Sequence, residues 1–228
     1  MTDRLRRMAH LFKPLVRLAR PHQYVKNAFV FLPVLFGHRL TDSGALRLSS
    51  LVFVTFCLLA SAVYTINDIT DKEEDREHPQ KRLRPLASGE VTTLQAVLFF
   101  LILVFVVVFV SIRFLPHSIW SIFGVYLGIN IAYSFYLRKV AIVDLFCLSS
   151  GFVLRVLAGA VSANVFGSHW IIIMTFLLSL FMALAKRRND LVFMESNQHQ
   201  GNHRRSLAGY NLEFVSIQNQ LRTTGVSP

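Results

Sequence analysis

Long uncharged apolar runs are the feature that most restricts how this chain can fold. Three of them, Leu48–Ile66, Val91–Ile112 and Ser118–Leu137, each hold about the 20 residues that an α-helix needs to cross a bilayer. A fourth apolar region, Ala141–Ala185, is too long for one span, and the segment Asn164–Ser168 divides it into two. Because a spanning segment must satisfy its own backbone hydrogen bonds in lipid, we predict an all-α, polytopic membrane helix bundle.

A shorter first span is predicted between Asn27 and Leu40, extended by Pro21–Lys26, which brings the predicted number of spans to six. The composition agrees with a membrane protein. The chain is 53% hydrophobic and only 16% charged, with a mean hydropathy of +0.46, whereas a soluble domain carries roughly 25% charged residues. The predicted organisation is a basic cytoplasmic segment over 1–26, a transmembrane domain over 27–212 and a polar tail over 213–228.

The basic residues are distributed very unevenly between the two predicted sides of the membrane. A net charge of +11 can indicate nucleic-acid binding, but six crossings that start in the cytoplasm place nineteen Lys and Arg residues on the cytoplasmic side. Only Arg39, Arg47 and Arg113 fall on the other side. This positive-inside bias predicts a multi-pass protein of the inner (plasma) membrane, with its N-terminus and polar motifs in the cytoplasm and no nucleic-acid partner. The basic ring itself could attract anionic membrane lipids or hold a polyanionic substrate, and charge alone does not separate these readings.

The segment Asn67–Asp75 places an asparagine and three aspartates at the cytoplasmic end of an apolar run. If the helix continues at about 100° per residue, these side chains fall within an arc of about 100°. Carboxylates on one face suit Mg²⁺, and Mg²⁺ suits phosphate-bearing substrates. A solvated acidic loop is the alternative reading. The predicted metal ligands are Asn67, Asp68, Asp71 and Asp75, and the three aspartates are the candidate catalytic residues.

Basic segments follow the acidic motif and the last span. In the loop His78–Gly89, Lys81 and Arg84 are candidates for phosphate contacts, since Arg in particular can bind phosphate through two N–H groups. The segment Lys186–Leu191 is either a topology anchor or a second phosphate-binding arm opposite the acidic motif.

Asn130, Tyr133 and Arg138 lie near the cytoplasmic end of the fourth predicted span. Together they could reach a lipid headgroup or a diphosphate. The alternative reading of Tyr133 is a residue of the interfacial aromatic belt. Asn130 lies one turn inside the membrane from Tyr133 and therefore needs a polar partner there.

Arg155 lies within a predicted span, where a charge is costly unless it faces the bundle interior or a wet cavity. Gly151 and Gly159 flank it at one helical turn on either side and leave space for a neighbouring helix or a ligand. An interhelical clamp and a substrate-binding residue are both consistent with this pattern. Gly124 and Gly128 form a pair of small residues that we interpret as helix packing.

Taken together, these motifs resemble the UbiA-type polyprenyl transferase superfamily, and more narrowly its branch that contains decaprenyl-phosphate phosphoribosyltransferase. The similarity covers roughly residues 18–212. Asn67–Asp75 matches the first acidic motif of the superfamily in full, and Arg84–Gly89 matches the segment that follows it. The segments that resemble the narrower branch are Arg20–Asn27, Tyr133–Arg138, Gly151–Arg155 and Lys186–Leu191.

The resemblance implies a helical bundle around a lipid-open cavity, with Mg²⁺ at the cytoplasmic mouth. It implies transfer of a phosphoribosyl group from phosphoribosyl pyrophosphate to a polyprenyl phosphate, with release of diphosphate, in the synthesis of cell-envelope polysaccharide precursors. A homo-oligomer is compatible with this reading. By the resemblance, Asn67 and the three aspartates hold metal and diphosphate, and the substrate-binding candidates are Lys26, Tyr133, Arg138, Arg155, Lys186 and Asp190.

The chain departs from the superfamily pattern in two ways. The second acidic motif, usually DxxxD, is replaced by Asp190 in a basic segment, with no acidic residue four positions later. Family members usually have about nine spans, so six spans and a polar tail suggest that the remaining helices are truncated or supplied by a partner. The alternative functions are prenyl transfer to an aromatic or quinone precursor, an inactive membrane remnant or lipid-binding subunit, and a transporter.

Overall fold

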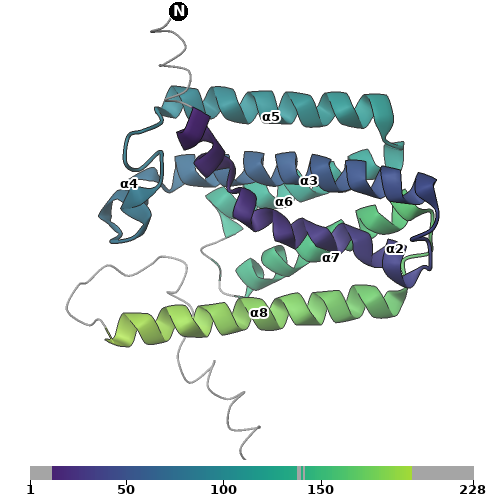
Figure 1. The fold of residues 1–228 in the computed structure, drawn as a ribbon. Coiled ribbons are helices and arrows are strands. Elements are labelled where there is room, and N and C mark those ends of the chain that lie inside the picture. Colours follow the sequence, from purple (N-terminus) through teal and green to yellow (C-terminus); the bar gives the residue numbers. More distant parts are fainter. Residues whose placement is uncertain (1–11, 138–139, 141, 197–228) are drawn as a thin grey trace, which may run out of the picture.

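The computed structural model describes residues 12–137, 140 and 142–196, with side chains as far as residue 189. Within these residues the secondary structure is entirely helical, and the helices lie side by side in one bundle (Figure 1). The five longest helices are each long and apolar enough to cross a membrane, which confirms five of the predicted spans. They are α3 (Ser43–Thr70), α5 (Thr93–Phe114), α6 (His117–Phe135), α7 (Val143–Ala163) and α8 (His169–Ser196).

The first predicted span differs from the expectation of a single α-helix over 27–40. It consists of a 3₁₀-helix, η1 (Pro21–Phe31), followed directly by the short helix α2 (Leu32–Phe36). A 3₁₀-helix rises about 2.0 Å per residue, so η1 and α2 together extend about 30 Å, which is the thickness of a hydrocarbon core. In Figure 1 these elements run from the α4 end of the bundle to the opposite end.

Local sequence explains where the long helices begin. The carboxylate of Asp42 accepts hydrogen bonds from the backbone N–H groups of Gly44 (2.9 Å) and Ala45 (3.1 Å), and so caps α3. These two bonds hold the pKa of the exposed Asp42 carboxyl below its usual value. Helix α5 begins with a capping box in which Thr92 and Gln95 exchange side-chain and backbone hydrogen bonds.

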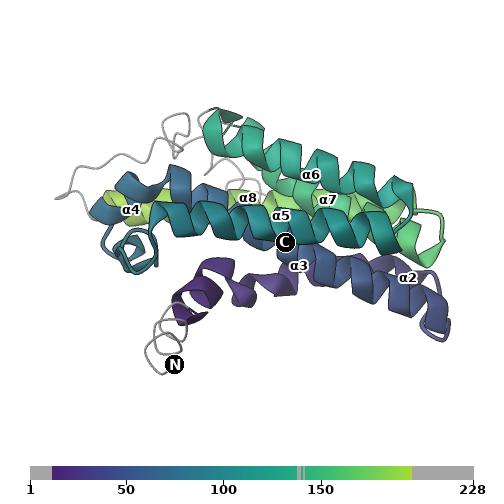
Figure 2. The same cartoon turned by 90° about the horizontal axis from the view of Figure 1, so that it is seen from above.

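Helix α3 is the centre of the bundle. It contacts η1, α5, α6 and α7, and Figure 2 shows α6 and the η1–α2 segment on opposite sides of α3 and α5. Phe56 of α3 packs edge to face against Phe123 and Tyr126 of α6, with ring centroids 4.9 and 5.3 Å apart. The apolar stretches of α5, α6 and α8 are mostly exposed, as expected for helices that face lipid.

The alternating direction of the helices brings all the polar motifs to one end of the bundle. The end of α3 leads there into the short helices α4 (Lys72–Glu77) and η2 (Lys81–Leu83), which lie beyond the bundle proper (Figure 1). The start of η1, the start of α7 and the C-terminal part of α8 lie at the same end. Residues far apart in the sequence can therefore share one site.

Glycine allows η1 to approach α7 closely. A Cβ atom added at Gly159 would lie 2.0 Å from the carbonyl oxygen of Val30, so no larger residue fits without moving η1. By contrast, beyond the adjacent residues and the local backbone of α6, no atom of the described chain lies within 4 Å of a Cβ added at Gly124 or Gly128. The prediction that this second pair packs against a neighbouring helix is therefore wrong within the described residues.

We expect Gly159→Ala to destabilise the protein by roughly 1–3 kcal/mol, because overpacking at a backbone contact forces η1 away from α7. The measurement is thermal unfolding of the purified protein in detergent. Gly124→Ala is the matched control and should keep or raise the unfolding temperature, because Ala is the better helix former. Equal unfolding temperatures for the two variants would show that η1 does not pack on α7 at this point.

Candidate functional site

A cavity of about 850 Å³ lies at the end of the bundle where the polar motifs meet. Its wall combines residues of η1, α3, α6, α7 and α8 with residues of the η2 loop, so it exists only in the folded chain. Most of the predicted site residues line it. They are Lys26, Asn67, Asp68, Asp71, Lys81, Arg84, Asn130, Tyr133, Arg155 and Lys186.

The remaining three predicted site residues are not among the cavity-lining residues. Asp75 is buried in α4, with 2% of its surface exposed, and its role as a metal ligand stays a prediction. Arg138 lies outside the described residues. Asp190 belongs to α8, but its side chain lies beyond the part of the helix whose side chains are described.

Asp68 joins three separate segments of the chain at one oxygen atom. Its Oδ1 accepts hydrogen bonds from the guanidinium groups of Arg20, which precedes η1, and of Arg84, which follows η2; the Arg84 bond measures 3.2 Å. The residue is 2% exposed. Its second oxygen, Oδ2, is buried and has no hydrogen-bond partner in the described residues. A buried carboxylate oxygen without a donor is well placed to bind a cation.

Asp75 is held by the same basic loop. Arg84 Nη1 lies 2.5 Å from Asp75 Oδ2 and also bonds to Asp68, so a single guanidinium bridges both aspartates. Lys81 Nζ lies 3.7 Å from the other oxygen of Asp75. Since the carboxylate is buried, these contacts stabilise its charge and fix the loop against α4.

The acidic motif keeps helical hydrogen bonds on both sides of the junction between α3 and α4. The backbone N–H of Asp71 bonds to the carbonyl of Asn67 (2.9 Å), and the N–H of Asp75 bonds to the carbonyl of Asp71 (2.8 Å). The expectation that the helix continues into the motif is therefore confirmed as far as Thr70, but Asp71 has a non-helical backbone (φ −95°, ψ 2°) and separates α3 from α4. The Asn67 side-chain oxygen accepts a hydrogen bond from Ser134 of α6, which ties the acidic motif to the segment that carries Tyr133.

Two predicted polar residues within the spans have neutral partners. Asn130 donates to the carbonyl of Tyr126, 2.8 Å away, one turn earlier in α6. Arg155 donates from Nε to Asn27 Oδ1 (2.7 Å), from Nη1 to the Gly151 carbonyl (2.6 Å) and from Nη2 to the Tyr126 hydroxyl (3.0 Å). Because Arg155 links α7 to α6 and η1 and also lines the cavity, both readings offered by its sequence position remain compatible with the structure.

The sequence reasoning missed several cavity residues, among them Arg20, Tyr126 and Arg187. Arg20 had a usable sequence signal, since it directly precedes Pro21 at the start of a span. In the structure its backbone is left-handed (φ 54°), and its guanidinium lies 5.2 Å from the Tyr64 ring centroid. Tyr126 had none, because an aromatic residue within an apolar helix is usually core. Arg187 could not be singled out from the sequence, because it stands between two other basic residues, Lys186 and Arg188.

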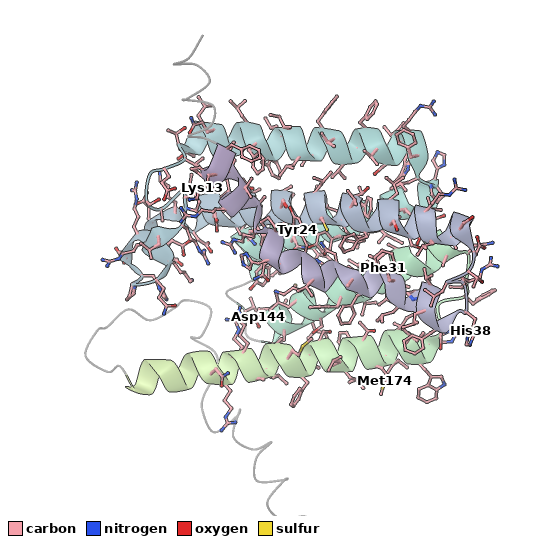
Figure 3. The ribbon with its side chains drawn as sticks, in the orientation of Figure 1. Lys13, Tyr24, Phe31, His38, Asp144 and Met174 are labelled. Atoms are coloured by element: carbon pink, nitrogen blue, oxygen red, sulfur yellow. The ribbon has the colours of Figure 1, made fainter. Side chains whose placement is uncertain are left out.

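Arg187 fixes the end of α8 against α7. Its guanidinium donates to Asp144, with an Nε to Oδ2 distance of 2.9 Å, and Asp144 is fully buried. Figure 3 shows Asp144 at the start of α7. A paired buried charge can hold two helices in one relative position. The neighbouring Lys186 is thereby brought to the cavity wall.

The cavity lining is strongly basic. Among the residues that the structure describes, eight Lys and Arg residues line it against three Asp and Glu residues. Such an excess within low-dielectric walls attracts polyanions. The basic residues are Arg17, Arg20, Lys26, Lys81, Arg84, Arg155, Lys186 and Arg187, and the acidic ones are Asp68, Asp71 and Glu74.

The sequence matches the UbiA prenyltransferase family over residues 30–205. The chain belongs to the UbiA prenyltransferase family. This finding and the membrane-length helices make it an integral, multi-pass membrane protein. It confirms the resemblance and the fold class predicted from the motifs.

Curated relatives share about a third of their residues with this UbiA protein. Decaprenyl-phosphate phosphoribosyltransferase of Mycolicibacterium smegmatis is 34% identical over 210 residues, which are 90% of this chain and 65% of the relative. The protein of the same name from Mycobacterium tuberculosis is 34% identical over 222 residues, or 96% of this chain and 72% of the relative. Nodulation protein NoeC of Azorhizobium caulinodans is 34% identical over 172 residues, 75% of this chain and 55% of that protein. The chain thus spans about two thirds of the length of the phosphoribosyltransferases that it matches.

Solved structures share the fold at lower identity. A UbiA homologue from Archaeoglobus fulgidus, bound to DMAPP and Mg²⁺, superposes with a TM-score of 0.72 over 92% of this chain and 72% of its own. The sequence identity is 18%, so this similarity concerns the fold.

The UbiA motif in this chain has the donor chemistry that Mg²⁺ prefers. Asn67, Asp68 and Asp71 offer amide and carboxylate oxygens to one cavity, and the orphaned oxygen of Asp68 has no competing donor in the described chain. Within the described residues, no group of three or more His, Cys, Asp or Glu side chains is close enough together to hold a metal ion as the structure stands. The protein's own arginines balance the acidic charge instead.

We expect Asp75→Asn to destabilise the protein by about 1–3 kcal/mol, because Arg84 and Lys81 lose a buried anionic acceptor. Heat or denaturant unfolding in detergent measures this effect. Glu73→Gln is the matched control, since Glu73 is an exposed carboxylate on the same helix that is paired with Arg76. Its effect should stay within about 0.5 kcal/mol. If the two variants lose the same stability, Asp75 does not anchor the loop.

Proposed function

We propose that this UbiA-family protein transfers a phosphoribosyl group from phosphoribosyl pyrophosphate to a polyprenyl phosphate and releases diphosphate. The observation that carries the proposal is the excess of eight basic over three acidic side chains in the cavity. The two proposed substrates together bring a diphosphate, a sugar phosphate and a lipid phosphate. Prenyl transfer to an aromatic ring brings one diphosphate only, and so places less negative charge in this basic cavity. The relatives named as phosphoribosyltransferases support the same reaction.

The acidic motif is the proposed metal and diphosphate subsite. Asn67, Asp68 and Asp71 would hold Mg²⁺, with Asp75 next along the motif. The ion would supply positive charge to the leaving diphosphate. Arg20 and Arg84, which donate to Asp68 in this structure, lie where they can also donate to a bound diphosphate.

The proposed reaction needs no side-chain nucleophile. An oxygen of the lipid phosphate forms a bond to the anomeric carbon of the ribose while the bond from that carbon to the diphosphate breaks. The diphosphate leaves with the electron pair. A phosphate monoester is largely ionised at neutral pH, so no general base has to remove a proton. The role of the protein is to hold the two anionic substrates together and to stabilise charge on the leaving group.

We expect Asp68→Asn to lower Mg²⁺-dependent diphosphate release by at least about 100-fold, since it removes the charge of a carboxylate proposed to hold the ion. The assay incubates membranes that contain the chain with labelled phosphoribosyl pyrophosphate and a polyprenyl phosphate, with and without a chelator. Glu73→Gln, in the same acidic segment but outside the cavity, should retain full activity.

A parallel incubation with labelled prenyl diphosphate and an aromatic acceptor separates the two transferase reactions. Consumption of the prenyl donor while phosphoribosyl pyrophosphate stays intact would replace our proposal with prenyl transfer. If neither donor is consumed and purified protein retains no pyrophosphate in the presence of Mg²⁺, the chain is a non-catalytic membrane protein and the proposal fails.

The positive-inside charge distribution supports a cavity that opens to the cytoplasm. We therefore expect Gln80→Cys to resist a membrane-impermeant maleimide in intact cells and Thr41→Cys to react, in a background with both native cysteines replaced by serine. Gln80 and Thr41 are both exposed, at opposite ends of the bundle. After the cells are permeabilised, both should react. The reverse pattern in intact cells would place the cavity on the outer face.

A further inference from the structure

Within the part of the chain that the structure describes, Arg155 is a buried cation without an anionic partner. It is 5% exposed, and its hydrogen-bond acceptors are an amide, a backbone carbonyl and a phenol. No carboxylate of the described chain lies within ion-pair distance of it. The other arginine of similar burial, Arg187, is paired with Asp144. An unneutralised guanidinium within a membrane span is costly, and a bound anion would remove that cost.

Part of the donor capacity of Arg155 is unused. A guanidinium carries five N–H groups, and the three hydrogen bonds to Asn27, Gly151 and Tyr126 use three of them. The two that remain, one on each terminal nitrogen, are the number that a bidentate phosphate contact requires. Arg155, Gly151 and Tyr126 all line the cavity, so an anion within it can reach this group.

The surroundings hold the guanidinium in a fixed position. Asn27 is fully buried and donates from Nδ2 to Cys57 Sγ, 3.2 Å away. The guanidinium carbon lies 5.3 Å from the Phe56 ring centroid and 4.9 Å from that of Tyr126. Aromatic faces stabilise a cation without neutralising its charge. The position is therefore preorganised and still carries a full positive charge.

This position is well separated from the acidic motif. Phe56, which stacks on Arg155, is eleven residues before Asn67 in α3, or about 16 Å along the helix. Tyr126 is eight residues before Ser134, which bonds to Asn67, or about 12 Å along α6. A single phosphate group bound at Asp68 does not reach Arg155, so the cavity has room for two anionic groups at different depths.

We propose that Arg155, positioned by Asn27 and Tyr126, forms a second anion subsite that binds a phosphate monoester at the membrane-side end of the cavity. A monoester fits because its terminal oxygens can accept both free N–H groups and its charge offsets that of the cation. This inference rests on the proposed function, in which two groups have this chemistry: the 5-phosphate of the ribose donor and the phosphate of the lipid acceptor. The subsite would select one of them.

The test measures binding of three probes to the purified chain in nanodiscs: ribose 5-phosphate, a short-chain polyprenyl monophosphate, and pyrophosphate with Mg²⁺. We expect Arg155→Gln to weaken the binding of one monoester probe by about 10- to 100-fold, because the substitution removes a charged hydrogen-bonding group. Pyrophosphate binding should change less than about threefold. The monoester probe whose binding weakens identifies whether the phosphate belongs to the ribose donor or to the lipid acceptor.

Arg155→Lys addresses the case in which Arg155→Gln does not fold. It keeps the positive charge but loses the paired N–H groups of the guanidinium, so the binding of the same monoester probe should weaken about tenfold. Arg113→Gln, an exposed arginine at the opposite end of the bundle, should leave all three probes unchanged.

Two outcomes would overturn the inference. In the first, Arg155→Gln changes the binding of neither monoester probe. In the second, the variant weakens the binding of pyrophosphate as much as that of the monoester. If the monoesters and pyrophosphate with Mg²⁺ all bind to Arg155→Gln as tightly as to the unaltered chain, the subsite is absent while the proposed reaction stands. If a monoester depends on Arg155 but phosphoribosyl pyrophosphate is never cleaved, the subsite exists and the reaction assignment is wrong.

Discussion

The buried carboxylate of Asp68 accepts hydrogen bonds from two arginines that lie in distant parts of the chain. Arg20 comes from the segment before η1, and Arg84 comes from the loop after η2. A carboxylate at 2% exposure keeps its charge only where cations or N–H donors surround it. This shared acceptor therefore holds the N-terminal segment and the basic loop against the end of α3. The cavity wall at this end depends on that contact.

The cavity combines two different electrostatic environments. At the acidic motif the charges of this chain balance one another, since Arg84 bridges Asp68 and Asp75. A cation or a diphosphate that binds there must replace existing ion pairs, which favours the joint binding of the two. At Arg155 the partners are neutral and the positive charge is uncompensated. Helix α3 contributes to both regions, through Asp68 at one and Phe56 at the other.

The sequence predicted most of the spans and the acidic motif because both depend on local features. The apolar runs that became α3, α5 and α6 have the length that a bilayer requires, and the break at Asn164 separates α7 from α8. The 3₁₀ form of η1 was not predictable from apolar length. It accompanies the close approach of Val30 to Gly159, a contact between residues 129 positions apart. The pairing of Arg20 with Asp68 was not predictable either, since the two residues are 48 positions apart.

By itself, the sequence determined a multi-pass helical bundle and a single face on which its polar motifs gather. Apolar length sets the spans, and the bias of Lys and Arg predicts their direction, because each reflects the transfer of a short segment between water and lipid. Only the tertiary structure decided that Asp75 is buried behind Arg84, that Arg155 meets Asn27 and Tyr126, and that both regions open into one cavity. These contacts depend on how helices pack side by side, and packing depends on the shapes of residues that are distant in the chain.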